Sequence, residues 1–141
     1  EIDRLLNDGK LTQEQVDMID RKTLNEFLST KLIDRIIASQ LVMREKRFTA
    51  RLKPSDVFDE YKGVKTDVTV IIQGTVDLAF VEDGKLVIVD YKTDRVKDIT
   101  KLAGLYKKQL YLYKSAMEQS EELTVKECIL CSIHLGAYIT V

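Results

Sequence analysis

Two apolar runs flank the dipeptide Asp83-Gly84, and this arrangement constrains the fold more than any other feature of the sequence. Asp-Gly between hydrophobic runs is typical of a β-hairpin, because a type I′ turn needs positive φ at both central positions. With Asp83-Gly84 at the turn, Leu78 faces Val89, and Asp77 faces Asp90. The pattern therefore predicts a hairpin that brings two carboxylates together.

Lys92 is expected on the same face as Asp90, because side chains alternate along a strand and Tyr91 turns to the other face. Like charges directly opposed in a sheet are destabilising, so a cation should lie between the two aspartates. Carboxylates from two strands suit Mg²⁺, which also accepts phosphate oxygens. Lys92 beside such an ion could hold a phosphate oxygen or orient water, which is the chemistry of phosphodiester hydrolysis.

A plain Asp90–Lys92 salt bridge is the alternative, because an acid-x-Lys triplet alone is a weak signal. Other triplets of this kind in the chain include Glu60-Tyr61-Lys62 and Asp83-Gly84-Lys85. Neither has a second carboxylate in register across a strand, so only the triplet that begins at Asp90 has the context of a site.

The order of periodic segments indicates an α/β (α+β mixed) domain with a central mixed β-sheet. Residues 1–40 have helical patterns, including a capping box at Thr12 and one further helix whose apolar positions run from Leu24 to Ile37. Residues 41–141 read as a strand or two, an irregular passage around Pro54, the hairpin, a helix over 100–119 and a last strand over 125–141. With 45% hydrophobic residues in 141, we expect one domain.

Charge and cysteine content exclude some functions. The net charge of −1 gives no global basic field, although a local phosphate-binding groove is compatible with it, and the lysines and arginine over 92–114 read as a solvated face. Cys128 and Cys131 point to opposite faces of a strand, which favours reduced core thiols over a zinc site.

We find no signal peptide and no membrane span, and expect a cytoplasmic protein. Because the sequence starts at Glu1, we also expect it to be a piece of a longer chain.

Three motifs together resemble the PD-(D/E)xK nuclease superfamily. They are Gln73-Gly74-Thr75-Val76-Asp77, then Val89-Asp90-Tyr91-Lys92, then Gln109 with Tyr113, preceded by Arg44-Glu45 and Phe48. The similarity is greatest to the RecB/AddA branch, specifically the C-terminal nuclease domain of the AddA (RexA) components of bacterial ATP-dependent helicase–nucleases. It implies a restriction-endonuclease-like core over 41–141, preceded by a helical part over 1–40.

The resemblance assigns roles to six residues. Asp77 and Asp90 would bind the metal through side chains, Tyr91 through its backbone carbonyl, and Lys92 would be the catalytic lysine. Gln109 and Tyr113 would complete the catalytic set. The residues themselves support this last pair only in part: four-residue spacing puts them on adjacent helical turns, while a polar core residue is the alternative for Gln109, on a face with Leu102, Leu105, Leu112 and Ala116.

By the same resemblance the cofactor is Mg²⁺, with Mn²⁺ or Ca²⁺ as substitutes, and the activity is exonucleolytic cleavage of single-stranded DNA ends during double-strand-break repair. ATP would serve only a helicase part of the same polypeptide, since no phosphate-binding loop occurs here. A second subunit of the AddB/RexB type is the expected partner, with no membrane involved. A catalytically silent DNA-binding or interaction module, and a Cas4-like or restriction-like nuclease, remain alternatives.

One departure from the family pattern concerns histidine. The family places a metal-binding histidine on an upstream helix, whereas the single histidine here, His134, falls in the predicted last strand and is interpreted as structural. A domain excised after the upstream histidine is expected to bind metal weakly and to be inactive alone.

Gly74 in the first motif has a separate explanation, since a missing side chain lets a substrate approach a strand.

Overall fold

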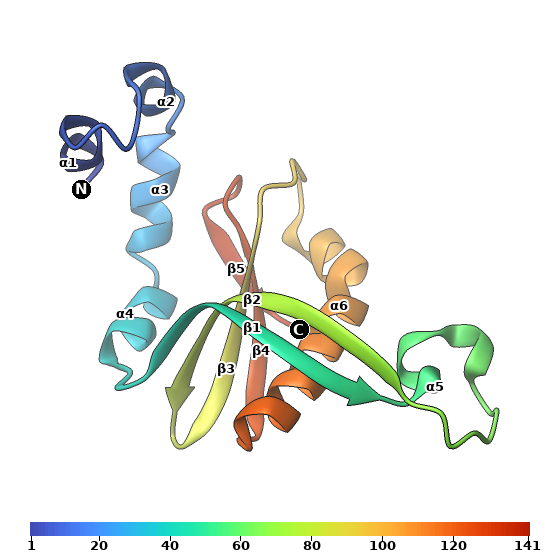
Figure 1. Cartoon of the computed structure of the whole chain (residues 1–141). Helices are drawn as coiled ribbons and strands as arrows, with labels where there is room; N and C mark the ends of the chain where they lie inside the picture. Colours follow the sequence, from blue (N-terminus) through green and yellow to red (C-terminus); the bar gives the residue numbers. More distant parts are fainter.

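The computed structural model describes residues 1–141 and places helices on both faces of a five-stranded mixed sheet (Figure 1). The strands lie in chain order from edge to edge, and only β3 and β4 are parallel. The strands are β1 (Val42–Leu52), β2 (Val70–Glu82), β3 (Lys85–Lys92), β4 (Val125–Ser132) and β5 (Ala137–Thr140). The helices are α1 (Ile2–Asn7), α2 (Gln13–Asp17), α3 (Arg21–Leu28), α4 (Lys31–Ala38), α5 (Pro54–Val57) and α6 (Ile99–Glu121), with a 3₁₀ turn η1 (Asp59–Tyr61). This confirms the predicted mixed sheet flanked by helices.

The hairpin forms in the predicted register. Asp83 and Gly84 have φ of 53° and 71°, as a type I′ turn requires, and the pairs run from Glu82–Lys85 to Leu78–Val89. The strand after the turn is buried along its length from Leu86 to Asp90. Such a continuous apolar run is expected of a central strand covered by helices on both faces.

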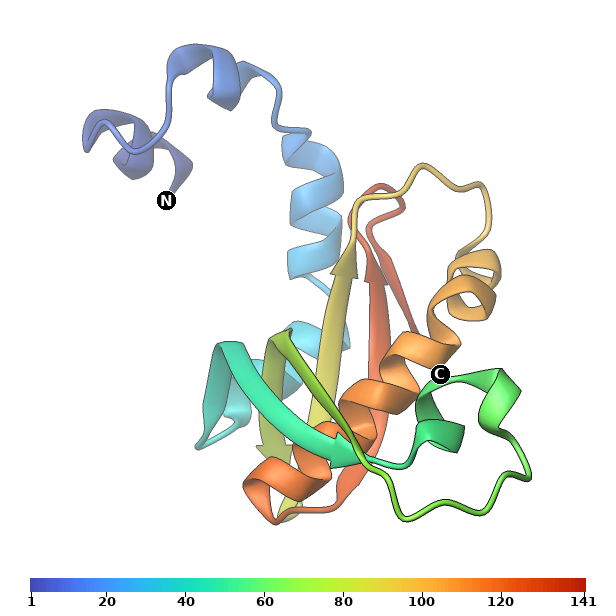
Figure 2. The same cartoon turned by 45° about the vertical axis from the view of Figure 1, so that its right-hand side comes forward.

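The two sheet faces have separate cores. On one face α6 packs over Ala79, Leu86 and Ile88, and on the other face α3 and α4 pack over Leu78, Phe80, Val87 and Val89 (Figures 1 and 2). Tyr91 packs against the second core, as its parity predicted. None of the helices combines the length and apolar composition that crossing a membrane requires.

Three element boundaries differ from expectation. The single helix expected over Leu24–Ile37 is two helices, because the Ser29 hydroxyl donates to the Asn25 carbonyl at 2.8 Å and Thr30 is extended. The last strand is also two, because a turn follows β4, where Gly136 has φ of 59°. Around Pro54 a short helix begins where irregular chain was expected, since proline suits the first helical turn.

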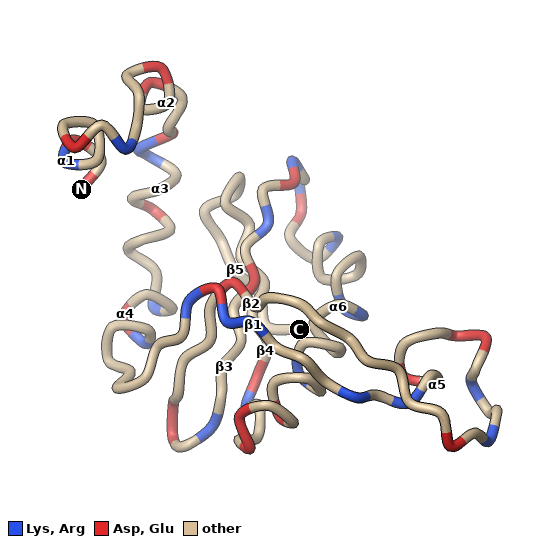
Figure 3. The backbone as a smooth tube through the Cα atoms, viewed as in Figure 1, with Lys and Arg blue, Asp and Glu red and all other residues tan.

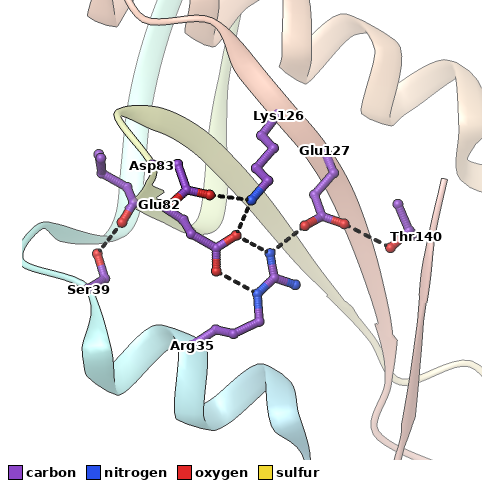
Figure 4. Close-up of polar contacts among 8 residues, drawn as sticks. Arg35, Ser39, Glu82, Asp83, Lys126, Glu127 and Thr140 are labelled. Atoms are coloured by element: carbon purple, nitrogen blue, oxygen red, sulfur yellow. Dashed lines mark hydrogen bonds and ion pairs between the residues drawn. The ribbon is translucent and has the colours of Figure 1, made fainter.

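A charged network attaches α4 to the hairpin turn and to β4 (Figure 4). Arg35 on α4 donates two hydrogen bonds to Glu82, each 2.8 Å, and a third to Glu127. Lys126 donates to Glu82 at 2.7 Å and to Asp83 at 2.8 Å. Because the Arg35, Glu82 and Glu127 side chains are only 20–27% exposed, this network is shielded more than a surface ion pair.

Candidate active site

Asp90 and Lys92 form a buried ion pair near the end of β3, on the face that α6 covers. The Asp90 side chain is 2% exposed and that of Lys92 is 14% exposed, and Lys92 Nζ lies 2.7 Å from Asp90 Oδ2. Burial raises the pKa of Asp90, Lys92 opposes that effect, and Asp77 adds a smaller upward contribution. An isolated carboxylate would be costly here, so the ammonium is what allows Asp90 to carry a charge.

Helix α6 surrounds the Lys92 ammonium with polar and aromatic groups. Lys92 Nζ donates to Gln109 Oε1 at 3.0 Å, and Gln109 Nε2 donates to the Tyr113 hydroxyl at 2.8 Å. The ammonium also lies 4.1 Å from the centre of the Tyr106 ring, within cation–π range. The structure thus brings Gln109 and Tyr113 together with Lys92, because residues four apart on a helix project from the same side.

Asp77 lies where β2 separates from β3, and its placement differs from the expected pairing with Asp90. The ladder ends at Leu78–Val89, and Asp77 Oδ2 instead accepts a hydrogen bond from the Tyr91 backbone N–H at 2.8 Å. The carboxylate therefore takes the place that a β2 backbone carbonyl would occupy in a continued ladder. It remains close enough to contribute to the raised pKa of Asp90.

A paired kink in β1 and β2 explains this departure. Val76 and Ala79 share one core although strict alternation would separate them, so β2 exchanges its faces at Asp77. The opposite residue in β1, Glu45, has φ of 49°, and these two residues are the one pair missing from an otherwise continuous register. Positive φ is uncommon for a non-glycine residue, and nothing in the local sequence pattern indicated it.

A cleft of about 450 Å³ opens at the kink beside Asp77. It is lined by Arg44, Glu45, Asp77, Leu78 and Tyr91. Arg44 thereby lines the same cleft as Asp77 and Tyr91. The sequence motif included Arg44, but no role could be assigned to it before its position across the strand from Leu78 was known.

The oxygens of this site fit a small divalent cation. Asp90 Oδ2 is fully buried, and the Lys92 ammonium lies 2.7 Å from it. A cation bound here would share this oxygen with the Lys92 ammonium, and hard oxygen ligands of this kind are those that Mg²⁺ prefers. No group of three or more His, Cys, Asp or Glu side chains is placed to hold a metal ion, and Asp77 lies near enough to Asp90 to raise its pKa.

The structure explains the glycine at position 74 differently from the prediction. A Cβ at this position would lie 2.6 Å from Cζ of Phe48, so the space beside Gly74 holds an aromatic ring and not a substrate. The Phe48 ring in turn meets the Tyr113 ring edge-on, with centroids 5.6 Å apart. Gly74 therefore supports the packing behind Gln109 and Tyr113.

Sequence reasoning missed Tyr106, whose spacing of three residues before Gln109 was the available signal. Its hydroxyl donates to Asp94, 3.1 Å from either carboxylate oxygen, which ties the end of β3 to α6. Leu105, expected on the face of Gln109, is instead 70% exposed. His134 lies in the turn after β4 and not in a strand, and it is exposed beside a cleft formed with α3.

The cysteines occupy the two cores separately, as predicted. Cys128 packs under α6 and Cys131 packs on the α3–α4 side, and both are free. Burial raises the pKa of Cys128 to about 11 and that of Cys131 to about 12. Residues on opposite faces of one strand cannot share a metal ion, so this pair does not extend the site.

Comparison with known proteins gives the same family as the motifs. The family model of the PD-(D/E)XK nuclease superfamily matches residues 2–137. Proteins named as the A subunit of an ATP-dependent helicase/nuclease are similar along the chain: one from Clostridium botulinum is 32% identical over 142 residues, covering 100% of this chain. One from Geobacillus thermodenitrificans is 33% identical over 141 residues, covering 94%. The chain spans 11% of the length of each of these relatives.

Proposed function

Because this chain belongs to the PD-(D/E)XK nuclease superfamily, we propose that it is the nuclease domain of a larger helicase–nuclease and hydrolyses DNA phosphodiester bonds at Asp77, Asp90 and Lys92. The observation that carries the proposal is the buried Asp90–Lys92 pair held against Gln109. A buried ion pair is seldom the most stabilising choice for a core, which favours a functional reason for it.

Lys92 is the group that would contact the scissile phosphate. Contacts to Asp90, Gln109 and the Tyr106 ring restrict its ammonium, so little conformational entropy remains to be lost when a phosphate oxygen binds. Of its three N–H donors, one faces Asp90 and one faces Gln109, so one remains for a phosphate oxygen or for the attacking water. Hydrolysis joins the water oxygen to phosphorus and breaks the bond to a sugar oxygen, which leaves with a proton.

Gln109 and Tyr113 act as positioning residues in this proposal. The amide NH₂ of Gln109 donates to the Tyr113 hydroxyl, and this fixes the amide so that its oxygen faces Lys92. Tyr113 is itself held by the Phe48 ring. The orientation of Lys92 therefore depends on α6, and a change at Gln109 should affect turnover more than stability.

Asp77, Asp90 and the Tyr91 carbonyl are the groups we propose as ligands of Mg²⁺, with Mn²⁺ as a substitute. A bound ion of this kind supplies Lewis acidity toward the phosphate and lowers the pKa of water. The hydrogen bond from the Tyr91 N–H holds the Asp77 carboxylate at the kink, which leaves its second oxygen for a cation.

The wider context is also proposed, from the relatives' names for the ATP-dependent helicase part and from the resemblance to the AddA branch for the rest. We propose that the domain removes nucleotides from single-stranded DNA ends during double-strand-break processing, attached to an ATP-driven helicase part and paired with a second subunit of the AddB/RexB type. A cytoplasmic location follows from that role and agrees with two cysteines that are both free.

The test measures degradation of end-labelled single-stranded DNA with Mg²⁺, by this chain and by a longer polypeptide that includes upstream sequence. Lys92→Met should reduce the rate by about 10²–10⁴-fold, the range for losing a positioned acid–base group, and Asp90→Asn should do the same. Asp83→Asn and Lys85→Met are matched controls, because they change the same residue types with the same spacing at the exposed hairpin turn.

If Lys92→Met and Asp90→Asn degrade DNA as fast as the unaltered chain does, this site is not the catalytic site. If the folded longer polypeptide degrades no DNA, the catalytically silent binding module becomes the better description. A rate restored to Asp90→Asn by Mn²⁺ in place of Mg²⁺ would support the ligand assignment directly.

A further inference from the structure

We propose that the outer surface of the β1–β2 ribbon is a binding site for the backbone of single-stranded DNA and leads the strand to Asp77; this rests on the proposed function. The ribbon is formed by residues 46–52 of β1 and 70–76 of β2, beyond the kink. We call its exposed surface the ribbon face, which consists of Arg47, Thr49 and Arg51 on β1 and of Ile71, Gln73 and Thr75 on β2.

The kink at Glu45 and Asp77 separates the ribbon from the rest of the sheet. Beyond it β2 pairs only with β1, and the two strands run together across α6 toward α5 (Figures 1 and 2). Phe48 and Ala50 are buried against the α6 core, so Arg47, Thr49 and Arg51, which alternate with them, point outward. No element of the chain covers that outward side, and one end of it meets the cleft at Asp77.

The ribbon face is cationic and contains no acid. Between Glu45 and Asp56 the chain has basic residues at Lys46, Arg47, Arg51 and Lys53 and no acidic residue, and 70–76 carries no charge at all. Figure 3 shows basic positions along β1, and the part of β2 beyond the kink runs uncharged beside them. In a chain of net charge −1, such a segment is a local exception.

Arg47 and Arg51 are free to bind an anion. Neither takes part in an ion pair, whereas Lys46, on the inner side, contacts Glu121 at 2.9 Å. The Arg51 backbone is held by Gln119, whose side chain accepts from its N–H at 2.7 Å and donates to its carbonyl at 3.1 Å. The strand is thus anchored to α6 while both guanidinium groups remain available.

A phosphate backbone matches this surface better than other anions. Guanidinium groups bind phosphate oxygens through paired N–H donors, and Thr49, Gln73 and Thr75 add neutral hydrogen-bonding groups of the kind that contact phosphate and sugar. Arg47 and Arg51 lie roughly 13 Å apart along one strand, at about 3.3 Å per residue, so they form a single row. A single row of cations follows one phosphate chain, and Ile71, 61% exposed, offers apolar surface to a base.

The test is binding of fluorescent oligo(dT) to the chain without metal, so that cleavage plays no part, at several salt concentrations. In the variant Arg47→Gln/Arg51→Gln, the affinity at low salt should fall roughly tenfold or more. The slope of log K against log salt should shrink by about 1.4, at ~0.7 for each lost phosphate contact. Glutamine keeps the stem of the side chain, and circular dichroism checks that the variant is folded.

The control variant Lys10→Gln/Lys85→Gln removes the same charge from two exposed lysines without ion pairs, and should retain both affinity and slope. Equal losses in the two variants, no loss in either, or equal affinity of the unaltered chain for duplex DNA would overturn the proposal. Asp90→Asn should still bind oligo(dT) without metal. The two proposals can therefore be refuted separately: DNA binding by the ribbon face is tested by the arginine variants, and cleavage is tested by the variants of Asp90 and Lys92.

Discussion

Arg35 is expected to be the most important ionic residue for stability outside the site, and Arg35→Met tests this. Its guanidinium donates to both Glu82 and Glu127 and lies 5.7 Å from the centre of the Phe80 ring. After the substitution Glu82 keeps Lys126, while Glu127 keeps only the hydrogen bond from the Thr140 hydroxyl, of 3.0 Å. Methionine preserves the apolar stem, so mainly the charge interactions are lost.

Two estimates of the free energy of unfolding that Arg35 contributes agree. The pKa of Glu82 is lowered from 4.5 to about 2, first by the hydrogen bonds from Arg35 and then by those from Lys126. At ~1.4 kcal/mol for each pKa unit this is ~3.5 kcal/mol for both partners, and partial exposure and the remaining Lys126 reduce the share of Arg35 to ~2 kcal/mol. Hydrogen bonds to charged groups, at ~1.5–3 kcal/mol when buried, lead to a similar value for this half-buried network.

The assay is urea unfolding at pH 7 and at lower pH. Because the Glu82 pKa is lower in the folded chain, its contribution to the free energy of unfolding is complete above pH 4.5 and is lost as the pH falls through about 2. Arg35→Met should therefore lower the free energy of unfolding by ~2 kcal/mol at pH 7, and the difference from the unaltered chain should narrow between pH 4.5 and 2.

Arg21→Met is the matched control, because Arg21 pairs with Asp3 at 3.1 Å where both side chains are more than half exposed. Such a pair contributes ~0–1 kcal/mol. The reasoning is refuted if the two variants lose equal stability at pH 7, or if the difference caused by Arg35→Met grows as the pH is lowered.

Three further predictions concern the cores and the site. Gly74→Ala should lower the free energy of unfolding by ~1–3 kcal/mol in urea titrations, because its Cβ would meet a packed ring at 2.6 Å; an unchanged midpoint would show that the ring moves freely. Gln109→Leu should slow DNA cleavage at least ~10-fold while the unfolding midpoint changes little, which separates positioning from folding. Cys128 and Cys131, with pKa raised to about 11 and about 12, should resist thiol reagents at pH 8 until urea unfolds the chain; rapid reaction of the native chain would contradict their burial.

Local patterns were sufficient wherever one short-range rule governs the structure. The Asp83-Gly84 turn set the register, and the register set which residues share a face, so the contact of Lys92 with Asp90 and the separation of Cys128 from Cys131 could be predicted. Helical spacing likewise predicted that Gln109 and Tyr113 project together. The catalytic roles of these residues stay predictions, because proximity and burial do not demonstrate a reaction.

The sequence by itself determined the hairpin, the alternation of faces and the spacing on α6, since each depends on neighbours a few residues away. Only the tertiary structure decided that Glu45 and Asp77 form a kink, because the kink lets the ribbon lie across α6. Residues distant in the sequence make that contact, so no local sequence pattern predicts it. The same long-range packing placed the Phe48 ring over Gly74 and left Arg47 and Arg51 on an open surface. The position of Asp77 at the end of that surface is therefore a property of the folded chain and not of any motif.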